Sequence, residues 1–308
     1  MLDPRELYEL DETVLDSWPA GEAPVLVVSL DGFVDAGNAG RLAVMHLFAE
    51  FDARPVATFD VDQLVDYRGR RPTMVFDTDR WVSYAEPALA VYELRDSEGT
   101  RFLVLTGKEP DLQWERFAAA VTDLTQRLGV RLTVGLNAIP MPVPHTRPTT
   151  VTTHGTRPEL VRDDERWFRG AEVPASAAAL LEFRLGQAGY DAMGIAAHVP
   201  HYLAAGEYPS ASTALLRRLA RATGLSLPVA ALEEAAERGR AEIDQQVAAS
   251  EQATGVVRAL ERQYDAVVDG RQQAALLAPD EELDPGEFVA EVERFLAEQS
   301  PGDGPDPA

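Results

Sequence analysis

A chain of 308 residues with 45% hydrophobic and 26% charged residues can bury a large core, which excludes wholesale disorder. Its 51 acidic residues against 28 basic ones give a net charge of −23, and no arginine-rich patch with interleaved aromatic residues is evident. DNA, RNA and anionic membranes would be repelled by such a surface, so none of them is expected as a partner. The absence of cysteine excludes disulfides, thiolate metal sites and cysteine nucleophiles.

Residues 1–18 lack a basic region followed by an apolar stretch, so no signal peptide is expected. The longest apolar runs last only a few residues, whereas a membrane-spanning helix needs about 20. The sequence therefore predicts a cytoplasmic protein.

The chain alternates apolar strands with helices up to about residue 227. Val25 to Leu30 is a continuous, β-branched run, which is typical of a strand buried on both faces. This alternation predicts a three-layer α/β/α domain with a mainly parallel sheet. The other strands are expected at Phe102 to Thr106, Leu132 to Leu136, Ala192 to Ala197, Val56 to Phe59 and Val91 to Leu94.

The composition changes near Pro228 and becomes rich in Glu, Ala, Gln and Arg. One long helix is expected from Leu232 to Val268, and a second helix is expected to begin at Asp284 with an Asp-Pro-Gly-Glu start. The last nine residues are mostly Pro, Gly and Asp and should be disordered. The predicted organisation is an α/β core at 1–227, a helical appendage at 228–299 and a disordered tail at 300–308.

Polar residues follow the first two strands of the predicted parallel sheet, where ligands usually bind. Asp31, Asp35 and Asn38 follow one strand, and Lys108 and Glu109 follow the other. The two aspartates disfavour a phosphate and would suit a cation, a hydroxyl-rich ligand or an arginine-bearing partner. The favoured alternative is that they cap turns and the helix start. Lys108, the only lysine, either titrates in a reaction or forms an ordinary ion pair, and the ion pair is the commoner case.

Two histidine-bearing segments are further candidates for binding a ligand or a partner. Alternating prolines favour an extended, polyproline-like segment that carries Asn137 at a strand end and His145 and Arg147 beyond it. This segment is either a rigid crossover or a rim facing a ligand or partner. His198 and His201 flank Pro200, which breaks helical spacing, so no metal site is expected. We find no nucleophile elbow and no triad-like pattern, so no residue is assigned as catalytic.

Four of these segments occur in an order and spacing that resemble the proteasome assembly chaperone 2 family, in its bacterial (actinobacterial-type) branch. They read GFVDAGNA at 32–39, TGKEP at 106–110, NAIPMPVPHTRP at 137–148 and HVPHY at 198–202. The resemblance covers about residues 20–227, and the helical C-terminal region also resembles the extension of that branch. Each segment alone is weakly specific, whereas four in order are fairly specific.

The resemblance implies a fold similar to nucleoside phosphorylases and hydrolases, and a homo-oligomer such as a trimer. Eukaryotic members of that family chaperone assembly of the proteasome α-ring. The leading hypothesis is therefore a non-enzymatic binding or assembly protein without a cofactor, whose partners are itself and proteasome subunits or another protein. The alternative is a hydrolase or transferase acting on a small nucleoside-like ligand at the strand-end cleft. Family members that dock on proteasomes end in a hydrophobic-Tyr-any motif, and this sequence ends in Pro-Asp-Pro-Ala, so docking by that motif is not expected.

Overall fold

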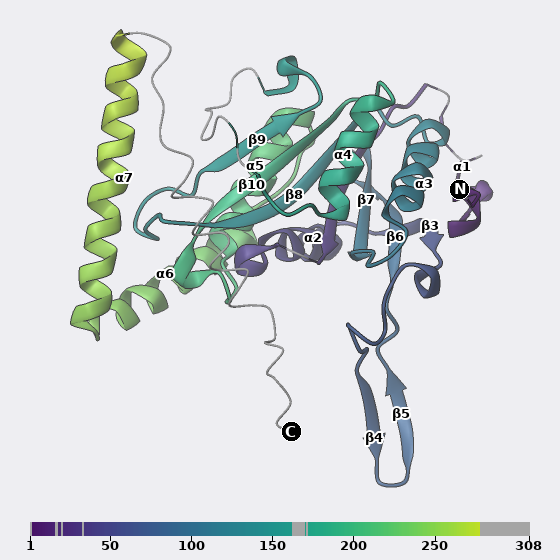
Figure 1. The fold of residues 1–308 in the computed structure, drawn as a ribbon, viewed down its shortest axis with the longest axis horizontal. Helices are drawn as coiled ribbons and strands as arrows, with labels where there is room; N and C mark the ends of the chain where they lie inside the picture. The colour runs from purple at the N-terminus through teal and green to yellow at the C-terminus, as the bar shows by residue number, and fades with distance from the viewer. Residues whose placement is uncertain are drawn as a thin grey trace, which may run out of the picture.

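The computed structural model describes residues 2–15, 18–19, 21–32, 34–161, 170 and 172–277. At its centre lies an eight-stranded sheet in the order β1-β3-β6-β7-β2-β8-β10-β9 (Figure 1). Four of the predicted strands lie side by side and run parallel: β7 (Arg101–Lys108), β2 (Val25–Asp31), β8 (Leu132–Met141) and β10 (Ala192–Pro200). The mainly parallel core is confirmed.

The remaining strands of the sheet are antiparallel to their neighbours. Two of them, β3 and β6, match the strands expected before Phe102, whereas β1 and β9 were not predicted. Both unpredicted strands are short and lie at the two edges of the sheet, where apolar patterning is weakest. Their bounds are β1 Tyr8–Leu10, β3 Arg54–Phe59, β6 Leu89–Arg95 and β9 Val151–Gly155.

Helices cover both faces of the sheet, which confirms the three-layer α/β/α architecture. Strand β2 shows why its sequence is continuously apolar: Val25 and Val27 pack into one core cluster, and Leu26 and Val28 pack into the other. The first cluster includes side chains of α2 (Ala39–Glu50) and α5 (Pro209–Thr223), and the second includes those of α3 (Trp114–Arg127) and α4 (Ala177–Gln187).

Strands β8 and β10 run further than expected, which corrects the polyproline interpretation of the segment after Leu136. They pair residue by residue up to Pro200 and Met141, so Asn137 and His198 lie within strands. Strand β2 stops pairing with β8 at Gly135, and the rest of β8 has a continuous neighbour on one side only. A proline is tolerated in such a half-paired strand, because the missing N–H costs no ladder bond.

The expected helix from Leu232 to Val268 is two helices, α6 (Ala230–Ala248) and α7 (Glu251–Leu277). Ser250 separates them, and its hydroxyl accepts a hydrogen bond from the backbone N–H of Ala253 at 3.2 Å, as an N-cap does. The helix predicted to begin at Asp284 and the tail predicted at 300–308 lie outside the described residues. None of the described helices is long and apolar enough to cross a bilayer.

A two-stranded hairpin, which the sequence analysis did not predict, projects away from the sheet (Figure 1). It consists of β4 (Met74–Asp77) and β5 (Arg80–Tyr84), and it is inserted between β3 and β6. All nine of its strand residues are exposed.

Candidate functional site

The carboxyl edge of the parallel strands carries the first group of predicted site residues. Asp31 and Lys108 end adjacent strands in register, and their side chains form an ion pair. The side chains are 54% and 40% exposed, so the pair is an ordinary surface interaction worth up to ~1 kcal/mol. Arg70 donates hydrogen bonds to the backbone oxygens of Asp31 and Glu109, which ties these two strand ends together.

Glu109 is buried beside this pair, with 6% exposure. Its carboxylate accepts a hydrogen bond of 2.7 Å from the backbone N–H of Ala177, the first residue of α4. A negative charge at a helix N-terminus is favourable, because it satisfies a free amide and complements the helix dipole. Gly32 packs so closely on Glu109 that a Cβ there would overlap the carboxylate. Glu109 thus joins the loop after β2 to the start of α4.

Asp35 performs the same task at the start of α2. Its carboxylate accepts hydrogen bonds from the backbone N–H groups of Gly40 at 2.8 Å and Arg41 at 3.0 Å. Burial raises the pKa of Asp35, and the two amide hydrogen bonds oppose that rise. Asn38 adopts the left-handed conformation with φ of 51°, and its side-chain amide donates to the backbone oxygen of Gly206 at 3.4 Å. The bonds of Asp35 fit the capping interpretation of these residues.

A small pocket of about 210 Å³ lies at this edge, and Glu109 and Asn137 are among its lining residues. Its other walls are mostly apolar and include Leu30, Ile139 and Pro174. Ligand pockets usually measure roughly 300 to 1,000 Å³, so this one is small for a nucleoside. His154 lines it as well and pairs with Glu182 at 2.8 Å, which raises the pKa of His154.

His145 connects the core to helix α6 through a chain of hydrogen bonds. The Tyr202 hydroxyl accepts the backbone N–H of His145 at 3.0 Å and lies 2.6 Å from its Nδ1. The Nε2 of the same ring lies 3.1 Å from a carboxylate oxygen of Asp244 on α6. Burial raises the pKa of Tyr202 to about 12, which keeps this hydroxyl protonated.

Arg147 connects the same loop to helix α7. Its guanidinium forms two hydrogen bonds with Asp265, at 2.7 and 2.6 Å, and a third with Glu261 at 3.3 Å. These carboxylates raise the pKa of Arg147 above its ordinary value. Thr146 adds a hydrogen bond of 2.6 Å to Glu261. The loop at 142–150 therefore contacts the C-terminal helices of its own chain, which contribute Asp244, Glu261 and Asp265.

The two histidines of the fourth segment have different surroundings. His198 is 1% exposed, and its ring nitrogens lie 2.9 and 2.7 Å from the hydroxyls of Thr150 and Thr152. His201 packs edge-on against Tyr202, and its buried Nδ1 has no hydrogen-bond partner among the described residues. Within that part of the chain, no group of three or more His, Asp or Glu side chains is placed to hold a metal ion.

The predicted site residues thus divide between two ends of the carboxyl edge. One group lies at the ends of β2 and β7 and within β8, and it contains Asp31, Lys108, Glu109 and Asn137. The other group contacts α6 and α7, and it contains His145 and Arg147. Their polar groups contact different partners and do not converge on one shared reaction centre.

Comparison with known proteins identifies the chain's relatives. The PAC2 family model matches residues 29–247, which is more than two thirds of the sequence. The chain belongs to the PAC2 family. No curated protein matches the sequence.

Three solved actinobacterial structures illustrate this membership. A Mycobacterium tuberculosis protein of unknown function is 47% identical to this PAC2 protein, with a TM-score of 0.82. The match covers 95% of this chain and 96% of the other chain. A Corynebacterium glutamicum protein of unknown function is 39% identical, with coverages of 85% and 98% and a TM-score of 0.80. A Mycobacterium tuberculosis proteasome-assembly chaperone homologue is 28% identical, with coverages of 76% and 99% and a TM-score of 0.70.

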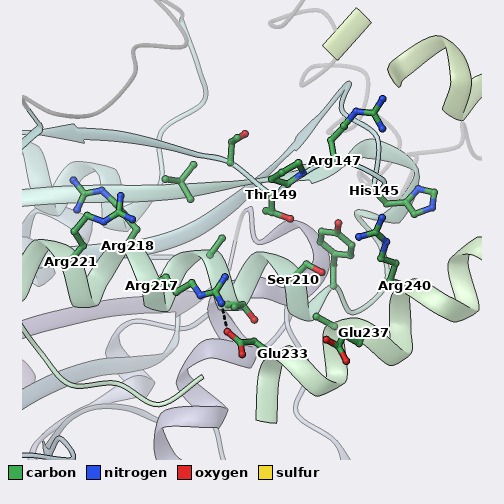
Figure 2. A pocket seen from close by; sticks show the side chains of 17 residues that line it. His145, Arg147, Thr149, Ser210, Arg217, Arg218, Arg221, Glu233, Glu237 and Arg240 are labelled. Atoms are coloured by element: carbon green, nitrogen blue, oxygen red, sulfur yellow. Dashed lines mark hydrogen bonds and ion pairs between the residues drawn. The ribbon is translucent and has the colours of Figure 1, made fainter. Parts of the chain in front are cut away.

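One feature of this PAC2 protein escaped the sequence analysis: an arginine-lined groove between α5, α6 and residues 145–151 (Figure 2). Its arginines come from three separate stretches of a strongly acidic chain, so the sequence does not show that they lie together. The sequence signal that could have revealed it is the Arg217-Arg218-Arg221 spacing on α5, which places three cations on adjoining turns.

Proposed function

We propose that this PAC2 protein is a non-enzymatic assembly protein that associates with copies of itself and binds proteasome subunits. The observation that carries the proposal is the projecting hairpin, because its exposed apolar side chains suit contact with protein. Similarity to the proteasome-assembly chaperone homologue, over 99% of that chain, supports the choice of proteasome subunits as partners.

The hairpin concentrates apolar surface in one place. Half of the twelve exposed large apolar side chains of the described residues belong to it, and Trp81 is the most exposed of these six at 62%. Phe76 and Trp81 pack edge to face, with ring centroids 5.2 Å apart. An isolated two-stranded hairpin is marginal in water, and a large exposed apolar patch marks a site of protein interaction. The six residues are Met74, Val75, Phe76, Trp81, Val82 and Tyr84.

A second copy of this chain is the occupant that fits the hairpin best. Residues 74–84 carry one arginine and two aspartates, so the hairpin contributes little to the net charge of −23 that the whole chain carries. The hairpin's weak charge therefore opposes contact with an identical hairpin only slightly. Among the described residues, no further strand pairs with the outer edges of β4 and β5. An identical hairpin can pair there through its own backbone N–H and C=O groups.

The bonds at the strand-end edge support binding over catalysis. Asp35 and Glu109 hold the first turns of α2 and α4, and Lys108 is paired with Asp31. A catalytic acid or base must reach a substrate proton, whereas these carboxylates face backbone amides.

The proposal is tested by mixing the full chain with proteasome α-subunits of the same organism and measuring mass by light scattering. We expect a species that contains both proteins and a faster appearance of α-rings than without the chain. If the masses of the two proteins are unchanged on mixing and the rate of ring formation is also unchanged, the proteasome assignment is contradicted.

The enzymatic alternative is tested with Lys108→Met. We expect the native chain to show no turnover on nucleosides or simple esters, and the variant to keep its fold with at most a small loss of stability. Measurable turnover in the native chain that disappears in a folded variant would overturn the non-enzymatic assignment.

A further inference from the structure

We propose that the arginine-lined groove between α5, α6 and residues 145–151 binds an extended acidic peptide segment of a protein partner. The inference rests on the proposed function as a protein-binding chain and names the chemistry that this surface recognises.

The local charge of the groove is opposite to that of the molecule. Five arginines line it against two glutamates, whereas the chain as a whole carries −23. A cleft lined by one sign of charge concentrates the field of its side chains and attracts the opposite charge. The arginines are Arg147, Arg217, Arg218, Arg221 and Arg240, and the glutamates are Glu233 and Glu237.

Two of these guanidiniums are available to a ligand. Arg217 is paired with Glu233, and Arg147 is held by Asp265. Arg221 and Arg240 form no ion pair with any carboxylate of the described residues, and both are exposed. The planar guanidinium presents two parallel N–H groups that match the two oxygens of a carboxylate, so both residues can bind acidic side chains bidentately.

The shape of the groove favours a peptide over a single small anion. Its volume is about 770 Å³, which is large enough for several residues of chain. Figure 2 shows Arg218 and Arg221 at one end, Arg240, Arg147 and His145 at the other, and Arg217 between them. One phosphate cannot reach cations at both ends, whereas carboxylates spaced along an extended chain can.

Polar groups in the middle of the groove suit a peptide backbone. Hydroxyls of Thr149 and Ser210 are among the lining groups, and they can donate to or accept from main-chain amides. The hydrogen bond between His145 and Asp244 joins α6 to residues 142–150, so the two walls of the groove are linked before a ligand binds. A preformed groove costs less ordering on binding.

Fluorescence anisotropy of a labelled oligoglutamate peptide, titrated with the full chain at low salt, tests the inference. We expect saturable binding that weakens roughly tenfold or more in the double variant Arg221→Gln/Arg240→Gln, since each lost contact is a charge-assisted pair. Arg258→Gln, which removes an exposed charge from α7, is the matched control and should bind as the native chain does. Thermal melting should be unchanged in both variants, because these side chains are exposed.

Three results would overturn the inference: no binding of the peptide, equal weakening by Arg258→Gln and the double variant, or tripolyphosphate binding that exceeds oligoglutamate binding and is lost in the double variant. The last result would reassign the groove to a phosphate-bearing ligand. Failure here is distinguishable from failure of the proposed function, because proteasome α-subunits can be titrated in parallel. If the chain binds α-subunits but not the oligoglutamate peptide, the proposal for the groove alone is refuted. If it binds the peptide but not α-subunits, the proteasome partner alone is refuted.

Discussion

The central sheet and the β4–β5 hairpin use the same kinds of residue in opposite surroundings. Phe102 in β7 is fully buried between layers of helices and neighbouring strands, whereas Phe76 in β4 is 56% exposed. The difference is the second layer: α2 and α5 cover one face of the sheet and α3 and α4 cover the other, whereas no residue of the hairpin belongs to either core cluster. Apolar strands without a covering layer are best explained as a surface that another protein covers.

The largest expected effect separates the two regions by stability. Phe102→Ala should lower the free energy of unfolding by about 3–5 kcal/mol, because a buried aromatic ring leaves a cavity. Phe76→Ala should change the stability of the isolated chain by no more than ~0.5 kcal/mol, since its ring is already exposed. Urea unfolding at low protein concentration measures both. Equal losses would remove the contrast between the buried sheet and the exposed hairpin.

The next effect concerns association. Phe76→Ser combined with Trp81→Ser should shift the chain towards the mass of a single copy, because it removes the exposed aromatic pair near the turn of the hairpin. Phe183→Ser is the control, since this aromatic side chain is 58% exposed on α4 and lies outside the hairpin. Sedimentation velocity reads the mass distribution. A shift caused equally by the control would place the contact elsewhere.

A smaller effect is expected where residues 142–150 hold the C-terminal helices. Arg147→Met removes three charge-assisted hydrogen bonds to α7 and should loosen that helix locally, with a small effect because the side chain is partly exposed. Amide exchange should rise in α7 and remain unchanged in β2 and β7. Arg258 lies on α7 and has no such bonds among the described residues, so Arg258→Met should leave exchange in α7 as it is. Uniform exchange changes across the sheet would refute a local role.

The smallest effect is a titration at the sheet edge. Glu182 raises the pKa of His154, so the protonated pair stabilises the fold below the ordinary histidine pKa and this contribution is lost as pH rises through the raised value. His154 is 54% exposed, which limits the contribution to under ~1 kcal/mol. NMR titration should show the pKa of His154 falling in Glu182→Gln. An unchanged pKa would show that the pair does not form in solution.

The buried strands could be predicted from sequence because short, continuous apolar runs such as Val25 to Leu30 are typical of strands with both faces covered. The hairpin could not be predicted in the same way, because aromatic residues such as Phe76 and Trp81 are usually buried. Nothing in the local sequence shows that these two are exposed. The break at Ser250 was missed although a serine before glutamate is a helix-start signal, because the surrounding residues are strong helix formers.

The sequence predicted where the candidate site residues lie more successfully than which groups they contact. Asp31 and Lys108 were placed on neighbouring strand ends from sequence, and the structure pairs them. The contacts of His145 and Arg147 with Asp244 and Asp265 join residues about a hundred positions apart, and no local pattern encodes them. The arginine-lined groove was hidden for the same reason, because a net charge of −23 says nothing about local sign.

The mass of the native full-length chain, measured by light scattering at micromolar concentration, tests the central claim most directly. The account predicts a mass of two or more copies, because the exposed apolar side chains of the hairpin should be covered by another copy. A mass equal to one chain at that concentration would contradict the claim that the hairpin is a self-association surface.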